Sequence, residues 1–330
     1  MRASVTARVP LLVVSLAACG GSPAVDVCSP AARFPDGIEY GPQVALPTPT
    51  SILVAWRTTA AGAGAVEYWT AATTPVRVDG AGAGRDQAVP LEGLVSGAAY
   101  SYRVLVDGVP VPGEHSFRTP PSDPAAAIRF AVVGDSGSGC PPQFQIADRL
   151  VLEDPDFILH TGDIAYNFGT ADEMRLRYFV PFAEPVARVP VFAVLGNHDH
   201  FTRGGEDVLQ ALQLPVNDED GTEHFYSFDR GGCHFAGVDT ELSLDPGGPQ
   251  LRWLARDLSG TAARWRFLFL HRCPYSSSRN GSQLDVRAAI EPFLGPSAID
   301  LVFAGHDHNY ERTLPLRLEA VVDAGREPDY

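Results

Sequence analysis

Five short apolar segments between residues 129 and 305 each lead into side chains that can bind a metal ion. Apolar runs of this length that end at glycine predict buried β-strands. In four of the five, a glycine stands just before the polar residue and permits a sharp exit from the strand. The polar residues are Asp135, Asp163, Asn197 to Asp199, His271, and His306 with His308. Because strand ends line the ligand-binding crevice of an open α/β sheet, we expect these residues to form one metal site.

Helical patterns lie between these segments and predict an α/β domain over residues 126–330. The expected helices cover residues 143–153, 171–182, 250–258 and 283–294. Alternation of strands with helices is typical of α/β layering. Residues 225–239 are expected to form a hairpin that turns at Gly231 and Gly232.

Residues 34–122 have a different pattern, which predicts a separate all-β domain. Residues 51–57 and 99–105 alternate between apolar and polar side chains, with glycine- and alanine-rich turns between them. Short strands with regular turns are typical of a β-sandwich. The region resembles a fibronectin type III domain, and we expect its Trp and Tyr side chains to form the core. The resemblance rests on Leu91 to Arg103, Trp56 and Ser116 to Thr119.

The N-terminus predicts export from a bacterial cell. Residues 1–19 combine arginines with a short apolar run, which is typical of a secretory signal and too short to span a bilayer. Leu16 to Cys19 resembles the bacterial lipoprotein cleavage box, so we expect lipidation of Cys19 to be the protein's only membrane attachment; the alternative is an ordinary signal peptide. Residues 20–33 would then form a tether, in the periplasm or at the cell surface.

Charge and cysteine content narrow the possible partners. A formal net charge of −15 argues against nucleic-acid binding, which normally requires a basic surface.

Beyond Cys19, four cysteines remain, and in an exported protein they allow three disulfide connectivities. We expect Cys140 to pair with Cys273, because both follow predicted strand ends. No CxxC spacing suggests a structural zinc site.

The donor types at the strand ends indicate the metal chemistry. Carboxylate, amide and imidazole donors without thiolate suit Fe, Mn or Zn. These donor residues are more numerous than one metal ion needs, and their number fits two ions. Two metal ions can share a carboxylate, hold a hydroxide nucleophile between them, and bind the oxygens of a phosphoryl group.

The five strand-end blocks, in order, resemble those of the purple acid phosphatases, which are calcineurin-like metallophosphoesterases. The resemblance covers roughly residues 34–312, and it implies a metallophosphoesterase β-sandwich flanked by helices and preceded by the fibronectin-like domain. Five blocks in order make the resemblance specific. The blocks are Gly134–Gly137, Gly162–Tyr166, Gly196–Asp199, Leu268–His271 and Gly305–His308.

The resemblance also implies the ligands of a dinuclear centre. Asp135, Tyr166 and His308 would bind the first ion, Fe(III), and Asp163 would bridge it to the second. A phenolate from Tyr166 on iron would give a visible absorption band.

The second ion, Fe(II), Zn or Mn, would be bound by Asn197, His271 and His306. His198 would act in catalysis, by stabilising the transition state or protonating the leaving group.

Other polar residues near the blocks are expected to act outside the set of metal ligands. His200 and Asn280 are candidate substrate contacts; Asn280 stands where bacterial relatives often carry a histidine. We expect Asp199 and Asp307 to orient loops, and His160 to be a core residue. Relatives usually continue beyond the equivalent of Tyr330, so we expect either a different closure of the second sheet or a truncated C-terminus.

The predicted function is hydrolysis of phosphate monoesters, of the acid phosphatase type, by attack of a metal-bound hydroxide. One alternative is a phosphodiesterase or nucleotide pyrophosphatase with the same metals. Another is an inactive surface-binding protein, although all seven ligand positions are intact.

Overall fold

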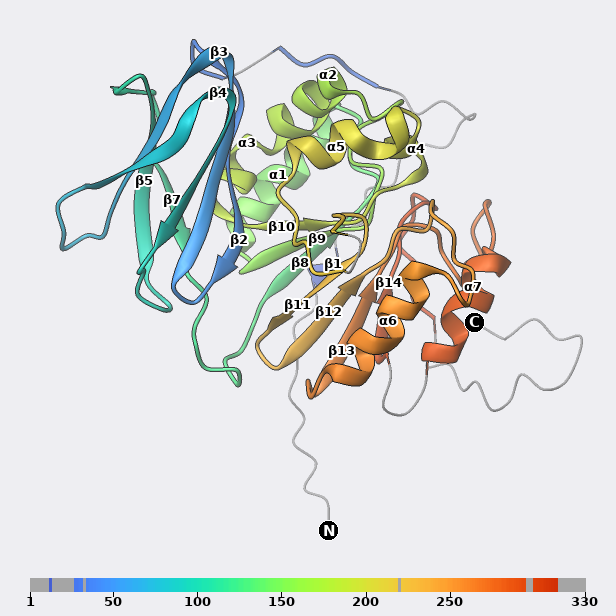
Figure 1. The fold of residues 1–330 in the computed structure, drawn as a ribbon. Helices are drawn as coiled ribbons and strands as arrows, with labels where there is room; N and C mark the ends of the chain where they lie inside the picture. Colours follow the sequence, from blue (N-terminus) through green and yellow to red (C-terminus); the bar gives the residue numbers. More distant parts are fainter. Residues whose placement is uncertain (1–11, 14–26, 32–33, 219–220, 295–298, 314–330) are drawn as a thin grey trace, which may run out of the picture.

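A computed structural model describes residues 12–13, 27–31, 34–218, 221–294 and 299–313 (Figure 1). An all-β N-terminal region packs beside an α/β domain that contains two sheets. The predicted α/β fold and the all-β texture of the N-terminal region are confirmed. Over the described residues, no helix has the length and apolar character needed to cross a bilayer.

The N-terminal region forms one antiparallel sheet around a long central strand. Its core contains Trp56, Tyr100 and Tyr102, all of which are buried, as predicted. The closer likeness to a fibronectin type III domain stays a prediction. The strands are β2 (Ile38–Thr48), β3 (Ser51–Trp69), β4 (Val76–Glu92), β5 (Ala99–Val106), β6 (Val109–Pro110) and β7 (His115–Arg118).

The first sheet of the α/β domain is parallel and has the order β1-β8-β9-β10. Its strands are β1 (Leu12–Val13), β8 (Phe130–Val133), β9 (Phe157–His160) and β10 (Val191–Ala193). The last three are apolar segments predicted to be strands, and all their residues are buried except Val191, which is partly exposed. Strand β1 falls within the predicted signal segment, and Cys19 lies outside the described residues.

The second sheet has the order β11-β12-β13-β14 and contains the two remaining predicted strand-end segments. The strands are β11 (Tyr226–Arg230), β12 (Cys233–Gly237), β13 (Trp265–Phe269) and β14 (Leu301–Phe303). The predicted hairpin is confirmed, because β11 and β12 pair in antiparallel register on either side of Gly231 and Gly232. The ring of Phe130 in the first sheet contacts Phe235 and Phe303 of the second, at centroid distances of 5.3 and 5.9 Å. The two sheets therefore form a sandwich.

Helices cover the outer faces of this sandwich, as the sequence predicted (Figure 1). On the first sheet lie α1 (Pro141–Glu153), a π-helical turn (Met174–Phe179) and α3 (Val180–Arg188). The short helix α2 (Ala171–Glu173) leads into the π-helical turn and buries no residue. On the second lie α6 (Pro249–Gly260), α7 (Leu284–Ile290) and a short 3-10 turn (Glu291–Phe293). Between β10 and β11 come α4 (Asn197–His200), a 3-10 turn (Arg203–Gly205) and α5 (Glu206–Ala211).

The N-terminal sheet rests on the helical layer that contains α3. The ring of Tyr40 stacks on Phe179 with a centroid distance of 4.2 Å, and the Tyr102 hydroxyl donates to the carbonyl of Ala187 at 2.7 Å. The buried Gln43 amide donates to the Ala211 carbonyl at 2.7 Å. Aromatic stacking and buried hydrogen bonds thus join the two regions.

The disulfide joins Cys28 to Cys140, so the expected pairing of Cys140 with Cys273 is wrong. The backbone N–H of Cys28 donates to the carbonyl of Ser138 at 2.8 Å, which holds it against the loop before α1. Cys273 is a free thiol whose Sγ lies 3.0 Å from the carbonyl of Gly305. The predicted tether is therefore fixed to the α/β domain at Cys28.

Candidate metal centre

The carboxyl ends of strands from both sheets meet at one edge of the sandwich. Hydrogen bonds join the loops that follow these strands. The Gly305 N–H donates to the carbonyl of His271 at 2.9 Å, which links the ends of β14 and β13. His271 Nδ1 lies 2.8 Å from the carbonyl of Thr161, which follows β9. Since a carbonyl only accepts, Nδ1 of His271 carries the proton, and its Nε2 is free to bind a metal ion.

Three side chains converge on one side of this edge. The Tyr166 hydroxyl lies 2.9 Å from Nε2 of His308 and 3.3 Å from Oδ1 of Asp135. Nε2 of His308 is also 3.3 Å from Oδ1 of Asp135. These three atoms form a compact set of two oxygens and one nitrogen, and they are the three side chains predicted to share the first ion.

A second group of three side chains meets beside the first. Nε2 of His271 lies 3.1 Å from Oδ1 of Asn197 and 3.2 Å from Nδ1 of His306. Two imidazole nitrogens and an amide oxygen at this spacing all offer lone pairs to a common point, and such donors suit a borderline divalent ion.

Asp163 lies between the two groups. Its Oδ1 is 3.5 Å from Nε2 of His271 and accepts a hydrogen bond from the backbone N–H of His198 at 2.9 Å. Asp135, Asp163 and His271 each offer a ligand atom, and these atoms lie within 4.8 Å of one another. The structure therefore brings together all seven side chains named from the sequence, and their donor types fit two metal ions.

The backbone at four of these residues is strained. Positive φ angles occur at Asp135 (53°), Asp163 (52°), His306 (73°) and His308 (52°). The left-handed region is unfavourable for residues other than glycine and persists only where the surrounding structure fixes it. Such strain clusters at functional sites, so these loops are held ready to present their side chains.

Charge interactions among the ligands favour cation binding. Although burial opposes ionisation, the hydrogen bond from His308 and the charges of His271 and His308 lower the pKa of Asp135. Burial raises the pKa of Tyr166 well above 10, and the negative charges of Asp135 and Asp163 raise it further. A phenol in this setting ionises only if a bound cation replaces its proton.

His198 and Asp199 occupy distinct positions beside the ligands. Nδ1 of His198 lies 2.8 Å from the carbonyl of Asn167, so this nitrogen is protonated and its Nε2 is available for proton transfer. The fully buried Asp199 accepts hydrogen bonds from the backbone N–H groups of Ile164 and Gly196, both at 2.9 Å. Asp199 therefore orients the loops after β9 and β10, as predicted.

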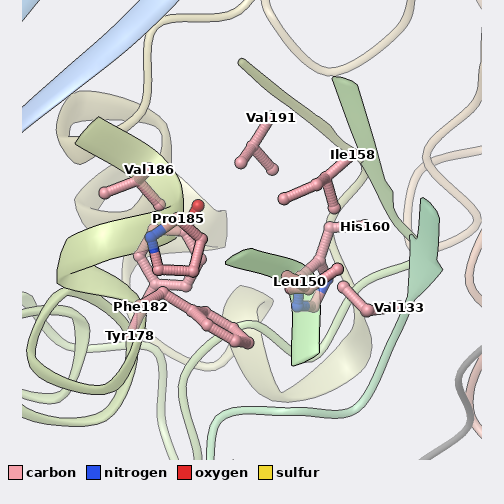
Figure 2. A pocket seen from close by; sticks show the side chains of 9 residues that line it. All are labelled: Val133, Leu150, Ile158, His160, Tyr178, Phe182, Pro185, Val186 and Val191. Atoms are coloured by element: carbon pink, nitrogen blue, oxygen red, sulfur yellow. The ribbon is translucent and has the colours of Figure 1, made fainter. Parts of the chain in front are cut away.

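His160 faces away from the ligands, as expected of a core residue. Figure 2 shows its ring among the side chains that line a small internal cavity between the first sheet and its helices. Its Nε2 lies 2.8 Å from the hydroxyl of Ser136. Burial lowers the pKa of His160 to about 4, so the ring is neutral at physiological pH. The cavity is lined by Val133, Leu150, Ile158, His160, Tyr178, Phe182, Pro185, Val186 and Val191.

The residues suggested as substrate contacts lie near the site but are held by other groups. Asn280 donates to the carbonyl of His306, one of the predicted ligands, at 3.1 Å. His200 Nε2 instead faces the carboxylate of Asp239 at 2.8 Å. A substrate role for Asn280 and His200 stays a prediction.

Comparison with known proteins gives a consistent family. The calcineurin-like phosphoesterase model matches residues 128–310. Purple acid phosphatase 23 of Arabidopsis thaliana is 28% identical over 260 residues, which cover 68% of this chain and 57% of that protein. Purple acid phosphatase of Glycine max is 28% identical over 216 residues, covering 60% and 46%. The chain spans about half the length of the curated relatives it matches.

Solved structures show the same fold. Purple acid phosphatase PPD1 of yellow lupin (Lupinus luteus) seeds matches with a TM-score of 0.68 and 20% identity, over 86% of this chain and 61% of that one. PhoD matches with a TM-score of 0.57 and 15% identity, over 79% and 69%. Because the family model covers more than half of the chain, the chain belongs to the calcineurin-like phosphoesterases.

Proposed function

We propose that the protein hydrolyses phosphate monoesters with a dinuclear metal centre, as an acid phosphatase. The family and the purple acid phosphatase relatives support a metal-dependent phosphoesterase, and the family implies the dinuclear centre. The observation that favours the monoesterase is the buried Tyr166 hydroxyl, which lies within 3.3 Å of both Asp135 and His308. Tyr166 closes the second of the five blocks that resemble those of the purple acid phosphatases.

We assign the first ion to Asp135, Tyr166 and His308, and the bridging position to Asp163. The second ion falls to Asn197, His271 and His306. When bound, two such ions stabilise the charge that develops on a phosphoryl group and supply a nucleophile at neutral pH. Iron in the first position, with Fe, Zn or Mn in the second, is the pair that we propose.

His198 is the proposed proton donor. The Asn167 carbonyl holds the proton on Nδ1 of His198, and the backbone of His198 is fixed to Asp163 by a 2.9 Å hydrogen bond. The ring also packs edge-on to Tyr166, with centroids 4.7 Å apart. These contacts fix the ring and leave Nε2 facing the site. In the imidazolium form, which carries a proton on each nitrogen, Nε2 would give its proton to the departing alcohol oxygen and leave the neutral ring with its proton on Nδ1.

The test is hydrolysis of a phosphate monoester and a phosphate diester by protein of measured metal content. Asp163→Asn removes the shared carboxylate and is expected to abolish turnover of both substrates. Asp86→Asn is the matched control, because Asp86 is an exposed carboxylate of the N-terminal sheet and pairs with Arg57 at 2.6 Å. This control is expected to keep full activity.

The outcome separates the proposal from its rivals. A preference for the monoester supports an acid phosphatase, whereas a preference for the diester favours a phosphodiesterase or nucleotide pyrophosphatase. No turnover by fully metal-loaded protein favours an inactive binding protein; one relative, 27% identical over 250 residues, is named probable inactive purple acid phosphatase 27.

We also propose that the protein is exported and anchored through lipidated Cys19. The disulfide between Cys28 and Cys140 supports export, since disulfides persist mainly in oxidising compartments. Metabolic labelling with a fatty acid, with and without Cys19→Ala, tests the anchor.

A further inference from the structure

A second group of side chains that can bind a metal ion lies outside the proposed dinuclear centre, and sequence motifs did not reveal it. His200 closes α4, His224 precedes β11, and Asp239 follows β12. In the antiparallel β11–β12 pair, Tyr226 lies opposite Gly237. His224 comes two residues before Tyr226 and Asp239 two residues after Gly237, so continuing this register places His224 opposite Asp239. Residues that lie opposite each other in this way project to the same side of the sheet.

The two imidazole rings converge on one oxygen atom of the Asp239 carboxylate. Oδ2 of Asp239 lies 2.8 Å from Nε2 of His200 and 2.7 Å from Nδ1 of His224. All three ligand atoms lie within 4.8 Å of one another. Asp239 is fully buried, whereas the His200 and His224 side chains are 14% and 21% exposed. The carboxylate therefore forms the buried side of the group, and the two rings form the side that is accessible to solvent.

The carboxylate of Asp239 is fixed by groups that do not use Oδ2. Its Oδ1 accepts from the backbone N–H of Glu241 at 2.9 Å. The side-chain amide of Gln250 spans the backbone N–H and carbonyl of Asp239, at 2.7 and 3.0 Å. Hydrogen bonds of this kind commonly orient a ligand residue in a metal site. Oδ2 is thereby left pointing at the two imidazoles.

We propose that His200, His224 and Asp239 form a third metal site, which takes one divalent ion of the zinc type. Zinc binds imidazole nitrogen and carboxylate oxygen at about 2.0–2.2 Å, so donors around a tetrahedral ion lie about 3.3 Å apart. The observed separations of 2.7 and 2.8 Å widen to that value with a shift of about half an ångström. Three protein ligands and one solvent-facing position then complete the coordination.

An ion at this place would act on the neighbouring centre through α4. The helix begins at Asn197 and ends at His200, so one end carries a proposed ligand of the dinuclear centre and the other a ligand of the third site. The ion would tie α4 to the end of the β11–β12 hairpin in the second sheet. We therefore assign it a structural role, in positioning Asn197 and His198.

His234 provides a control, because its ring also lies within hydrogen-bond distance of carboxylates. Its Nδ1 lies 2.8 Å from Asp229 and its Nε2 lies 2.6 Å from Asp257. These carboxylates contact opposite ring nitrogens, so the donor atoms do not converge on a point. His234 is therefore a hydrogen-bonded histidine without a metal site, and the same substitution can be made there.

The test is the zinc content of wild-type protein, His224→Gln and His234→Gln after dialysis against a buffer of fixed micromolar free Zn²⁺. We expect His224→Gln to hold one zinc ion fewer per chain than the wild type, and His234→Gln to hold the same number. Circular dichroism checks that each variant is folded. Equal zinc content in all three folded proteins would overturn the proposal and leave a hydrogen-bonded His–Asp–His group.

A second measurement needs no variant. Crystals of the wild-type protein grown in the same zinc buffer should give an anomalous difference peak among His200, His224 and Asp239. A map with density at the dinuclear centre and none among these three side chains would refute the third site alone. Both readouts are independent of turnover, so they separate the third site from the proposed phosphatase activity.

Discussion

Asp199→Asn should weaken both the fold and the metal centre, because Asp199 holds the two loops that carry Asp163 and Asn197. Its carboxylate accepts from the backbone N–H groups of Ile164 at 2.9 Å, Ala165 at 3.2 Å and Gly196 at 2.9 Å. Asparagine keeps one oxygen and turns an NH₂ group toward these donors, so at least one N–H loses its acceptor.

The magnitude follows from the buried hydrogen bonds that are lost. Burial, together with the charge of Asp163, raises the pKa of Asp199 to about 7, so its carboxyl group is only partly ionised at neutral pH. Leaving a buried backbone N–H without an acceptor costs about 1–3 kcal/mol, and we expect the free energy of unfolding to fall by that amount. Loss of a residue that orients metal ligands typically weakens metal affinity by about 10–100-fold. Urea unfolding measures the first effect, and competition with a chelator of known affinity measures the second.

Asp156→Asn is the control for this experiment. Asp156 also accepts from a backbone N–H, that of Arg129 at 2.7 Å, but it lies just before β9, at the end of the strands opposite the metal centre. We expect a smaller loss of stability and unchanged metal affinity. If Asp199→Asn bound metal as tightly as the wild type, the reasoning that assigns Asp199 to ligand positioning would be refuted.

Three further predictions test other parts of the structure. Replacing Cys28 and Cys140 by serine should lower the free energy of unfolding by about 2–5 kcal/mol, and a reductant should bring the wild type to the variant's urea midpoint without moving the variant; an unchanged midpoint would contradict the disulfide. Burial opposes the charged form of His234, yet its two carboxylate partners, Asp257 and Asp229, raise its pKa. The charged ring therefore stabilises the folded protein below about pH 6.5, and this stabilisation is lost as the pH rises through the folded-state pKa of His234. Urea unfolding across this range should show a smaller loss of stability in His234→Gln than in the wild type, and parallel curves would exclude the effect. Tyr166→Phe should abolish the visible absorption of iron-loaded protein while keeping its circular dichroism spectrum, and a retained band would rule out Tyr166 as the iron ligand.

The sequence predicted the strands of the centre well because their signals are local. Each apolar run and its following polar block can be recognised within about ten residues, and the carboxyl ends of strands such as β8 and β9 meet in any parallel sheet. The division of the five strands between two sheets was not evident from the runs themselves. It depends on the β11–β12 hairpin, which pairs with β13 and begins the second sheet.

Contacts between distant segments could not be predicted in the same way. The partner of Cys140 is Cys28, 112 residues away, and only the packing of the N-terminal segment brings them together. Cys273 follows a strand end, as expected, but it lies beside Gly305 rather than beside α1. The His200, His224 and Asp239 group was missed for the same reason, since its members share no motif and meet only through the hairpin register.

The backbone geometry shows why the local pattern is so regular. Eight residues other than glycine have positive φ among the described residues, and four of them are proposed metal ligands. Glycine precedes Asp135, Asp163 and His306. Gly162 has positive φ as well, but the ligand residues themselves are also left-handed, at positions where a side chain is required. At each of these positions the same residue must provide a side chain for the metal ion and adopt the left-handed backbone conformation that the turn requires. Strain of this kind costs about 1–3 kcal/mol per residue and survives only where surrounding contacts fix it. Contacts such as those of Asp199 therefore have to hold the loops rigid before any metal ion binds.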